Sequence, residues 1–316
     1  MRLVNVPWAR PGSGFTLLFE ALVMAMISAM PVNAVARRVK EHDTRLWRVI
    51  IHYVEQALAR ADFSSVTRVA VDETAAKRGH NYISLFVDID KRRVLHVADG
   101  KDAKTVAAFA ADLEAHGGKA QNIAEVCIDM SAAFIKGVGD HLPEAAITFD
   151  KFHAVKLVND AVDEVRRAEA KERPELKRSR YLWLKNQRNL SAGQQASLGS
   201  LSRLNLKTAR AYQLRLAFQD MYAEPSRWWA EGFLDRWLSW ARRCRLQPMK
   251  DVARTIKQHK EGILRWFNSK IANGLVEGIN SLVQAAKAKA RGYRSIRNLK
   301  AMVYILAGKL DLRLPT

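Results

Sequence analysis

After Val66 the apolar residues recur at every second position or form continuous runs, and this pattern predicts the strands of a sheet. Three successive segments alternate or run apolar and are joined by short polar connections: "VTRVAVDET", "YISLFVDID" and "RRVLHVADG". A period of two places successive side chains on opposite faces of a strand. We therefore expect three consecutive strands here.

Helices and strands alternate in the next part of the chain. An amphipathic pattern from about Ala103 to Ala115 predicts a helix; a buried strand "IAEVCIDMS", a helix over about 132–141, a strand "AAITFD" and a helix from about Lys151 follow. Short crossovers make the two later strands parallel neighbours of the first strand. The pattern predicts an α/β fold, a mixed sheet with helices on its faces.

Residues 15–61 have apolar residues at helical spacing and predict three helices. The first, "FTLLFEALVMAMISAM", is expected to be a buried helix, because it contains Glu20 and is too short to cross a bilayer. It also follows Pro and Gly in place of the basic leader of a signal peptide. Pro31 opens the second helix, "PVNAVARRV", and the third begins at Thr44.

The second and third helices have the pattern of a helix-turn-helix. The residues expected to point inward are Ala36, Val39, Trp47 and Ile50. The residues then available to DNA phosphates and base edges are Arg37, Arg38, Arg45 and Arg48. A plain three-helix support domain is the alternative, because Lys40 and Glu41 occupy the turn where a Gly and an apolar residue are more usual.

The chain from about Asp160 to Phe267 is helical and basic. No acid occurs between Leu176 and Gln219, although Lys and Arg are frequent there, so this segment predicts a positive surface. The region also contains Trp183, Trp228, Trp229, Trp237, Trp240 and Trp266. We expect most of these to anchor helix packing and not to stack on bases.

The composition indicates which kind of binding partner and which cellular compartment to expect. The chain has 52 Lys and Arg against 32 Asp and Glu, a net charge of +20 and a pI near 10.2, and such an excess indicates a polyanion partner, most often nucleic acid. A basic protein of the ribosomal or membrane-surface type is less compatible with the 48% hydrophobic content. Cys127 and Cys244 alone cannot form a disulfide framework or a four-Cys zinc module, so a cytoplasmic protein without a membrane partner is expected.

Two acids end predicted neighbouring strands. Asp72 closes the first strand and Asp129 closes "VCID", and the matched ends of adjacent strands, about 4.8 Å apart, let two carboxylates share a hard cation. Mg²⁺ prefers oxygen ligands, and phosphodiester chemistry needs such ions beside the substrate. The alternative is that each Asp is an ordinary turn former. Glu73 is expected to point to the opposite face from Asp72.

A third acid lies in "NGLVEGINS". On a helix Asn273, Glu277 and Asn280 share one face, and this polar stripe among apolar residues is unusual for a solvent-exposed surface. An amphipathic helix with a solvated polar face is the alternative. A basic track that could hold a DNA strand follows and includes Lys287, Lys289, Arg291 and Arg294.

Asp150 and His153 follow the last predicted strand, in "FDKFHAVK". His153 could contact a scissile phosphate or orient another site residue. A lone His near a strand end is more often structural, so both residues are candidates for an accessory role only.

Four segments together resemble the ordered blocks of bacterial insertion-sequence transposases of the DDE class, in particular the ISL-three family. They are "VAVDET", "VCIDMSAAF", "FDKFHAVK" and "NGLVEGINS…KARGYRS", and the resemblance covers essentially the whole chain. It implies an RNase H-like catalytic core in which Asp72, Asp129 and Glu277 are the catalytic and metal-binding acids. It also implies Mg²⁺ or Mn²⁺, with two ions expected. The order of strands and helices predicted from the apolar pattern agrees with that core.

The resemblance also implies a domain organisation. We expect a helix-turn-helix region at 1–62, the first part of the core at 63–160, an all-α basic insertion at 161–267, and C-terminal core helices with the final Glu at 268–316. Family members generally carry a Cys-rich zinc ribbon before the helix-turn-helix. The sequence "VNVPWARPGSGFT" resembles the tail of such a ribbon without its cysteines, which favours a truncated product or a late annotated start.

The function implied is transposition in a bacterial, nucleoid-associated setting. Such a protein cuts DNA at terminal inverted repeats and joins the 3′ ends to target DNA, and it works as a dimer or a larger synaptic complex. The alternative is a catalytically inactive or truncated transposase that acts as a DNA-binding repressor or inhibitory subunit. An RNase H-like nuclease or a resolvase is a less favoured third interpretation.

Overall fold

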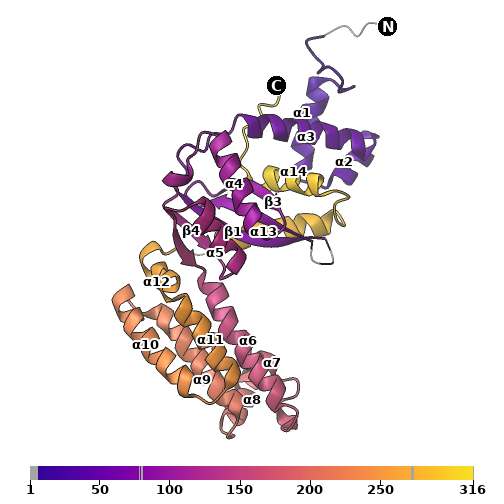
Figure 1. The fold of residues 1–316 in the computed structure, drawn as a ribbon. Helices are drawn as coiled ribbons and strands as arrows, with labels where there is room; N and C mark the ends of the chain where they lie inside the picture. The colour runs from indigo at the N-terminus through magenta and orange to yellow at the C-terminus, as the bar shows by residue number, and fades with distance from the viewer. Residues whose placement is uncertain (1–5, 78, 80, 272–273, 316) are drawn as a thin grey trace. The chain divides into compact units, whose positions relative to one another are not determined.

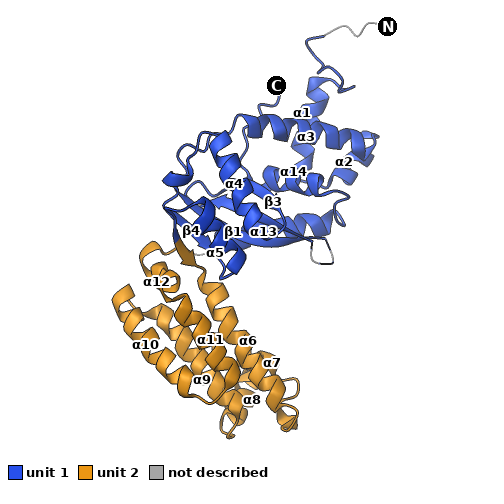
Figure 2. Ribbon diagram, viewed as in Figure 1, with its two compact units in different colours: residues 1–146, 273–316 blue, residues 147–272 orange. Residues whose placement is uncertain are grey.

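The structure is a computed structural model that describes residues 6–77, 79, 81–271 and 274–315 (Figure 1). It divides into two compact units, which Figure 2 shows in different colours. One unit combines residues 1–146 with residues 273–316, and the other holds residues 147–272. Within the described ranges, no helix is both long enough and apolar enough to cross a membrane.

Three helices open the first unit, as predicted: α1 (Leu17–Ile27), α2 (Val32–Val39) and α3 (Asp43–Ala59). The His42 side chain caps α3 by accepting a hydrogen bond from Thr44 N at 3.3 Å. Ala36 and Ile50 are buried as predicted. Val39 and Trp47 are only half-buried, because neighbouring apolar residues of the same helices take the inward positions.

Glu20 is fully buried on α1, and three side chains hold its carboxylate. Arg10 Nη2 donates to Glu20 Oε1 and Tyr53 Oη donates to Oε2, each at 2.9 Å, while Ser13 Oγ also donates to Oε1. Burial, followed by the contact with Glu20, raises the pKa of Tyr53 to about 12. The opposite face of α1 carries exposed leucines, so the prediction of a buried helix holds for one face only.

The sheet has the five predicted strands: β1 (Arg68–Lys77), β2 (Asn81–Asp88), β3 (Arg93–Asp99), β4 (Glu125–Ile128) and β5 (Ala146–Phe149). Their order is β3-β2-β1-β4-β5, with β1 antiparallel to β2 and parallel to β4. The prediction that both later strands neighbour β1 is therefore half wrong. β1 is already paired on both edges, so β5 lies beyond β4.

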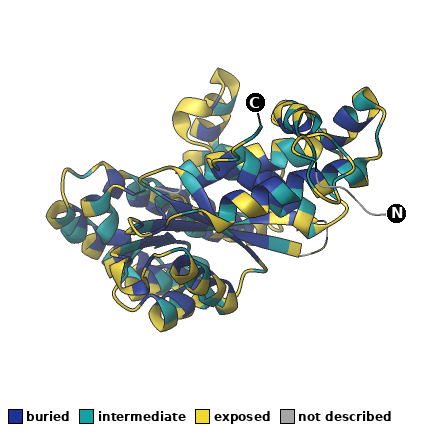
Figure 3. Cartoon of the chain, turned by 90° about the horizontal axis from the view of Figure 1, so that it is seen from above, coloured by how far each residue is buried: buried dark blue, intermediate teal, exposed yellow. Residues whose placement is uncertain are grey.

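Helices pack against this sheet, and most residues of the strands are buried (Figure 3). These helices are α4 (Ala103–Ala115), α5 (Ala132–His141), α13 (Gly274–Lys289) and α14 (Ile296–Ala307). Phe86 of β2 stacks on Phe109 of α4 with ring centroids 4.5 Å apart. Gly137 lets α5 approach α4, because a Cβ there would lie 2.8 Å from Val106 Cγ2.

The second unit is helical after its first residues. Its helices are α6 (Lys151–Glu169), α7 (Arg180–Leu184), α8 (Ala192–Ser202), α9 (Lys207–Asp220), α10 (Arg227–Arg243), α11 (Gln247–Gln258) and α12 (Lys260–Ser269). Trp183 and Trp237 are buried in it, and the Trp237 indole donates to Leu214 O at 2.8 Å.

The prediction that most tryptophans anchor packing is wrong for three of them. Trp228, Trp229 and Trp240 of α10 are exposed by 72%, 54% and 43%. Their positions lie outside the apolar face that α10 turns inward, which includes Leu234 and Trp237.

Candidate active site

Asp72 and Asp129 lie toward the same end of two adjacent parallel strands, Asp72 within β1 and Asp129 directly after β4. The pairs Arg68 with Glu125 through Ala70 with Cys127 keep a constant offset, and the same offset takes position 72 to position 129. Asp72 and Asp129 both lie two positions beyond the last of these pairs. The prediction that Asp72 closes its strand is wrong, because β1 stays paired with β2 as far as Lys77. β4 ends at Ile128, so its pairing with β1 stops there.

Amide groups orient both carboxylates. Asp72 Oδ1 accepts from Glu73 N at 2.8 Å, and Asp72 Oδ2 accepts from Asn280 Nδ2 at 2.8 Å. Asp129 Oδ1 accepts from Ser131 N at 2.9 Å. All three donors are uncharged, so these contacts fix the direction of each carboxylate without neutralising its charge.

The polar stripe predicted on α13 faces β1. Asn280 Nδ2 also reaches Glu73 O at 3.4 Å, Gln284 Nε2 donates to Thr74 Oγ1 at 2.7 Å, and Lys287 Nζ donates to Ala75 O at 2.6 Å. These side chains recur every three or four residues and therefore share one helix face. Asn280, Gln284 and Lys287 thus join α13 to the strand.

Glu277 lies on the same side of α13, in its first turn and one turn before Asn280. It is half-buried, as are Asp72 and Asp129. Asn273, the predicted accessory residue at the start of this segment, lies outside the described residues. Throughout the described ranges, no three His, Cys, Asp or Glu side chains form a group that could hold a metal ion in this conformation.

One oxygen atom beside Asp72 is suited to bind a hard divalent cation. Asn280 Oδ1 is buried and has no hydrogen-bond partner among the described residues, although the amide nitrogen of the same side chain binds Asp72. A buried carbonyl oxygen without a donor is costly, and a divalent cation is one group that satisfies it. Two carboxylates and this oxygen are the ligand types that Mg²⁺ and Mn²⁺ prefer.

Asp150 and His153 form a pair in the second unit. Asp150 is the buried N-terminal cap of α6, and its Oδ2 lies 3.1 Å from His153 Nδ1. A carboxylate in this position fixes the orientation and the tautomer of the ring. The two candidates are therefore in contact with each other, as an accessory pair would be.

The arginines predicted to contact DNA differ in their surroundings. Arg37, Arg38 and Arg48 are exposed. Arg45 instead donates to Glu41 Oε2 at 2.6 Å and to Gly14 O at 3.3 Å. Its guanidinium also lies 4.3 Å from the centre of the Phe15 ring, so it stabilises the helical region itself.

The turn between α2 and α3 forms without glycine. Lys40 adopts the left-handed conformation with φ of 56° and caps α2, the place where glycine is most favourable. The unusual turn residues noted in the sequence are thus compatible with a helix-turn-helix.

The basic residues after Glu277 are partly engaged. Lys287 binds Ala75 O, and Lys289 Nζ donates to Ala29 O at 2.9 Å. Arg291 and Arg294 are exposed, and Arg294 Nη1 lies 3.8 Å from Asp43 Oδ2.

Sequence reasoning missed Gln284 and stopped the polar stripe at Asn280. The signal was present, because Gln284 follows Asn280 by four residues on the same helix face.

A helix-turn-helix followed by a mixed five-stranded sheet of the RNase H-like type is the architecture of the DDE transposases. Residues 69–303 match the family model described as a transposase of the ISL3 group, and residues 4–54 match the model described as the helix-turn-helix domain of transposase family ISL3. The chain therefore belongs to the ISL3 family of DDE transposases. Membership implies DNA binding and the use of a divalent metal ion.

Named relatives agree with this assignment. The chain is 28% identical to the transposase for insertion sequence element IS1557 of Mycobacterium tuberculosis over 340 aligned residues, which cover 97% of this chain and 75% of the relative. It is 32% identical over 241 residues to the transposase for insertion sequence element IS1001 of Bordetella parapertussis, covering 74% of this chain and 59% of the relative.

Proposed function

We propose that this transposase cuts DNA at the terminal inverted repeats of its element and joins the freed 3′ ends to target DNA by two-metal phosphoryl transfer. The main support is the Asn280 hydrogen bond that ties α13, the helix of Glu277, to Asp72, together with the position of Asp129 directly after β4, the parallel neighbour of β1. Carboxylates gathered at the edge of a sheet are what metal-assisted phosphodiester chemistry requires.

Asp72, Asp129 and Glu277 are the proposed ligands of two Mg²⁺ or Mn²⁺ ions. When bound, such ions activate the attacking oxygen and stabilise the leaving oxygen of a phosphoryl transfer. The chain's own amides prepare the ligands, because Asn280 and Glu73 N orient Asp72 while Ser131 N orients Asp129. Asn273, Asp150 and His153 have proposed accessory roles.

DNA contacts are proposed on three parts of the chain. The helix-turn-helix region, residues 1–62, would read element ends through Arg37, Arg38 and Arg48, with Arg45 supporting that surface. The insertion, residues 161–267, and the segment after Glu277 would bind backbone phosphates. Two ends must be held together during transposition, so we expect a dimer or a larger synaptic complex.

The test is a nicking and strand-transfer assay on DNA that carries the element's ends, with Mg²⁺ or Mn²⁺. We expect metal-dependent cleavage and joining by the wild type and none by Asp129→Ala. Equal background activity in both proteins would contradict the proposal. End binding without any cleavage would then favour the alternative, a DNA-binding repressor or inhibitory subunit.

A further inference from the structure

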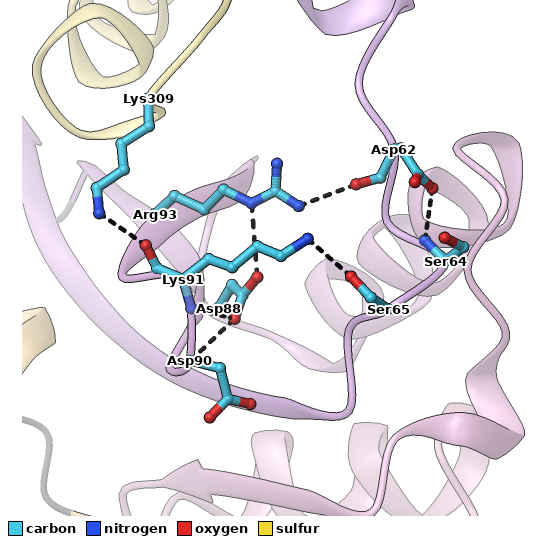
Figure 4. Close-up of polar contacts among 8 residues, drawn as sticks. All are labelled: Asp62, Ser64, Ser65, Asp88, Asp90, Lys91, Arg93 and Lys309. Carbon is cyan, nitrogen blue, oxygen red and sulfur yellow. Dashed lines mark hydrogen bonds and ion pairs between the residues drawn. The ribbon is translucent and has the colours of Figure 1, made fainter.

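A polar cavity of about 250 Å³ opens where β2 turns into β3. Its lining comes from three segments that are far apart in the sequence: residues 57–63 after most of α3, residues 91–94, and residues 308–313 after α14 (Figure 4). Asp88, at the β2–β3 turn, pairs with Val69 at the start of β1, so the cavity lies toward the opposite end of β4 from Asp129. It is a separate site from the candidate active site.

Positive charge dominates the lining. Five cationic side chains border the cavity against two carboxylates, an excess of three charges. The cationic residues are Arg60, Lys91, Arg93, Lys309 and Arg313, and the acids are Asp62 and Asp311. The volume is below the range of about 300–1,000 Å³ that is usual for small-molecule sites. The lining therefore suits a small anionic group better than an apolar ligand.

Three of these cations are held by uncharged oxygens. Lys91 Nζ donates to Ser65 Oγ at 2.7 Å, and Lys309 Nζ donates to Lys91 O at 2.8 Å (Figure 4). Arg60 Nη2 donates to Asp311 O at 3.2 Å. Hydroxyl and carbonyl partners position a cation but leave its full charge, so these contacts preserve the positive field of the cavity.

The remaining contacts make the site firm. Arg93 Nη2 donates to Asp62 O at 2.9 Å, and its Nε lies 3.5 Å from the buried Asp88 carboxylate. The segment with Lys309 follows α14, whose Tyr304 Oη accepts from Val97 N of β3 at 3.1 Å. Side chains from three segments are thus fixed around one cavity.

Arg60, which lines the cavity, lies at the end of a helix that is proposed to contact DNA. Arg60 ends α3, the helix that also carries the exposed Arg48. Arg48 and Arg60 are about 12 residues apart, which is about 18 Å along a helix. About five base-pair steps of a DNA duplex cover the same distance. A chain with a net charge of +20 and a DNA partner has a use for phosphate contacts beyond its helix-turn-helix.

We propose that this cavity is a second DNA-binding site, which holds a backbone phosphate of the duplex away from the carboxylates. It contributes affinity without sequence preference, because its donors are charged side chains that contact phosphate and not base edges. The inference requires the DNA partner of the family and does not require the proposed cleavage reaction.

The test is binding of the full chain to a labelled duplex in EDTA, measured by fluorescence anisotropy at several KCl concentrations. The variant Lys91→Ala/Lys309→Ala is compared with Lys104→Ala/Lys136→Ala, which removes two exposed lysines elsewhere in the same unit. We expect the first variant to bind about 10-fold more weakly near 0.15 M salt, and its log–log salt slope to be smaller in magnitude by about 1. The second variant should resemble the wild type.

Equal affinities and salt slopes for the two variants would overturn the proposal. If the first variant melts well below the wild type, Arg60→Gln replaces it, because Arg60 is exposed and its hydrogen bond is to the backbone carbonyl of Asp311. Arg60→Gln should again lower the salt slope. Saturable binding of inorganic phosphate that Lys91→Ala/Lys309→Ala removes, with DNA affinity unchanged in that variant, would assign the cavity to a free anion and would also overturn the proposal.

Discussion

Acidic side chains lie toward both ends of β4, and the groups that donate hydrogen bonds to them differ between the two ends. At the end with Asp129, the donors to Asp72 and Asp129 described above are neutral amides. At the other end, the acids of the β2–β3 turn are paired with arginines, Asp88 with Arg93 and Asp90 with Arg68. An amide leaves the carboxylate charge available to a metal ion, whereas a guanidinium neutralises it. We therefore expect substitutions at the first end to affect the proposed chemistry and those at the second to affect stability.

The sharpest test of this contrast is Asp72→Asn. Loss of a metal ligand is expected to lower cleavage by about 10³-fold or more, equivalent to about 4 kcal/mol of transition-state stabilisation. The melting temperature should change little, because Asn still accepts from the Glu73 amide and its amino group can donate to Asn280 Oδ1 once the Asn280 amide turns over. Glu73→Gln is the matched control and should retain activity within about threefold. Similar losses in both variants would remove the distinction between these adjacent acids.

Asp88→Asn tests the other end. Asp88 is 2% exposed, and its Oδ1 accepts from Asp90 N and Lys91 N at 3.0 Å each, while Oδ2 faces Arg93. Weaker hydrogen bonds and an unpaired Arg93 are expected to cost about 2–3 kcal/mol of unfolding free energy. Denaturant unfolding measures the change. Cleavage well below the melting temperature should stay near the wild-type rate, and a selective loss of cleavage would contradict the proposed division.

Asn280→Ala sharpens the comparison within the candidate active site. Removing an amide that orients a metal ligand commonly costs 10–100-fold, so we expect a loss of about that size and a requirement for more Mg²⁺. A Mg²⁺ titration of cleavage measures both. Gln284→Ala is the control, because Gln284 binds Thr74 and Ala75 on the same strand without touching an acid. An unchanged Mg²⁺ requirement in Asn280→Ala would show that this amide does not position Asp72.

The smallest expected effect is that of Asp90→Asn. The hydrogen bond from Arg68 lowers the pKa of Asp90, but both side chains are largely exposed, so the pair contributes less than about 0.5 kcal/mol at neutral pH. Because the folded pKa lies below the unfolded value, this contribution is present above about pH 4 and is lost as the pH falls further. Stability curves of the two proteins should converge in acid. Divergence there would contradict the assigned ion pair.

Local periodicity made much of the fold predictable. The strands and α4 and α5 appear where alternation and helical spacing placed them, because each pattern reflects one buried face. The neighbours of β5 were not predictable in the same way, since strand order depends on pairing between distant segments. The extension of β1 beyond Asp72 is a similar case, because it depends on its register with β2.

The sequence predicted which residues of the candidate active site lie on which helix or strand. It did not predict which of them contact one another. The spacing of Glu277 and Asn280 placed them on one helix face, while the hydrogen bond from Asn280 to Asp72 joins residues 208 positions apart. Arg45 was assigned to DNA because nothing in its neighbourhood reveals Gly14 and Phe15, which reach it through the packing of α1. The exposed tryptophans of α10 likewise depend on how that helix is oriented.

The discontinuous first unit has a consequence for synthesis of the chain. Asp129 and Glu277 are separated by the whole helical unit, residues 147–272. At about 5–20 residues per second, the ribosome needs roughly 7–30 s to pass from one acid to the other. During that interval the nascent chain already has its helix-turn-helix but not its third acid. Under the proposed function, we therefore expect a chain released during that interval to bind DNA without cutting it.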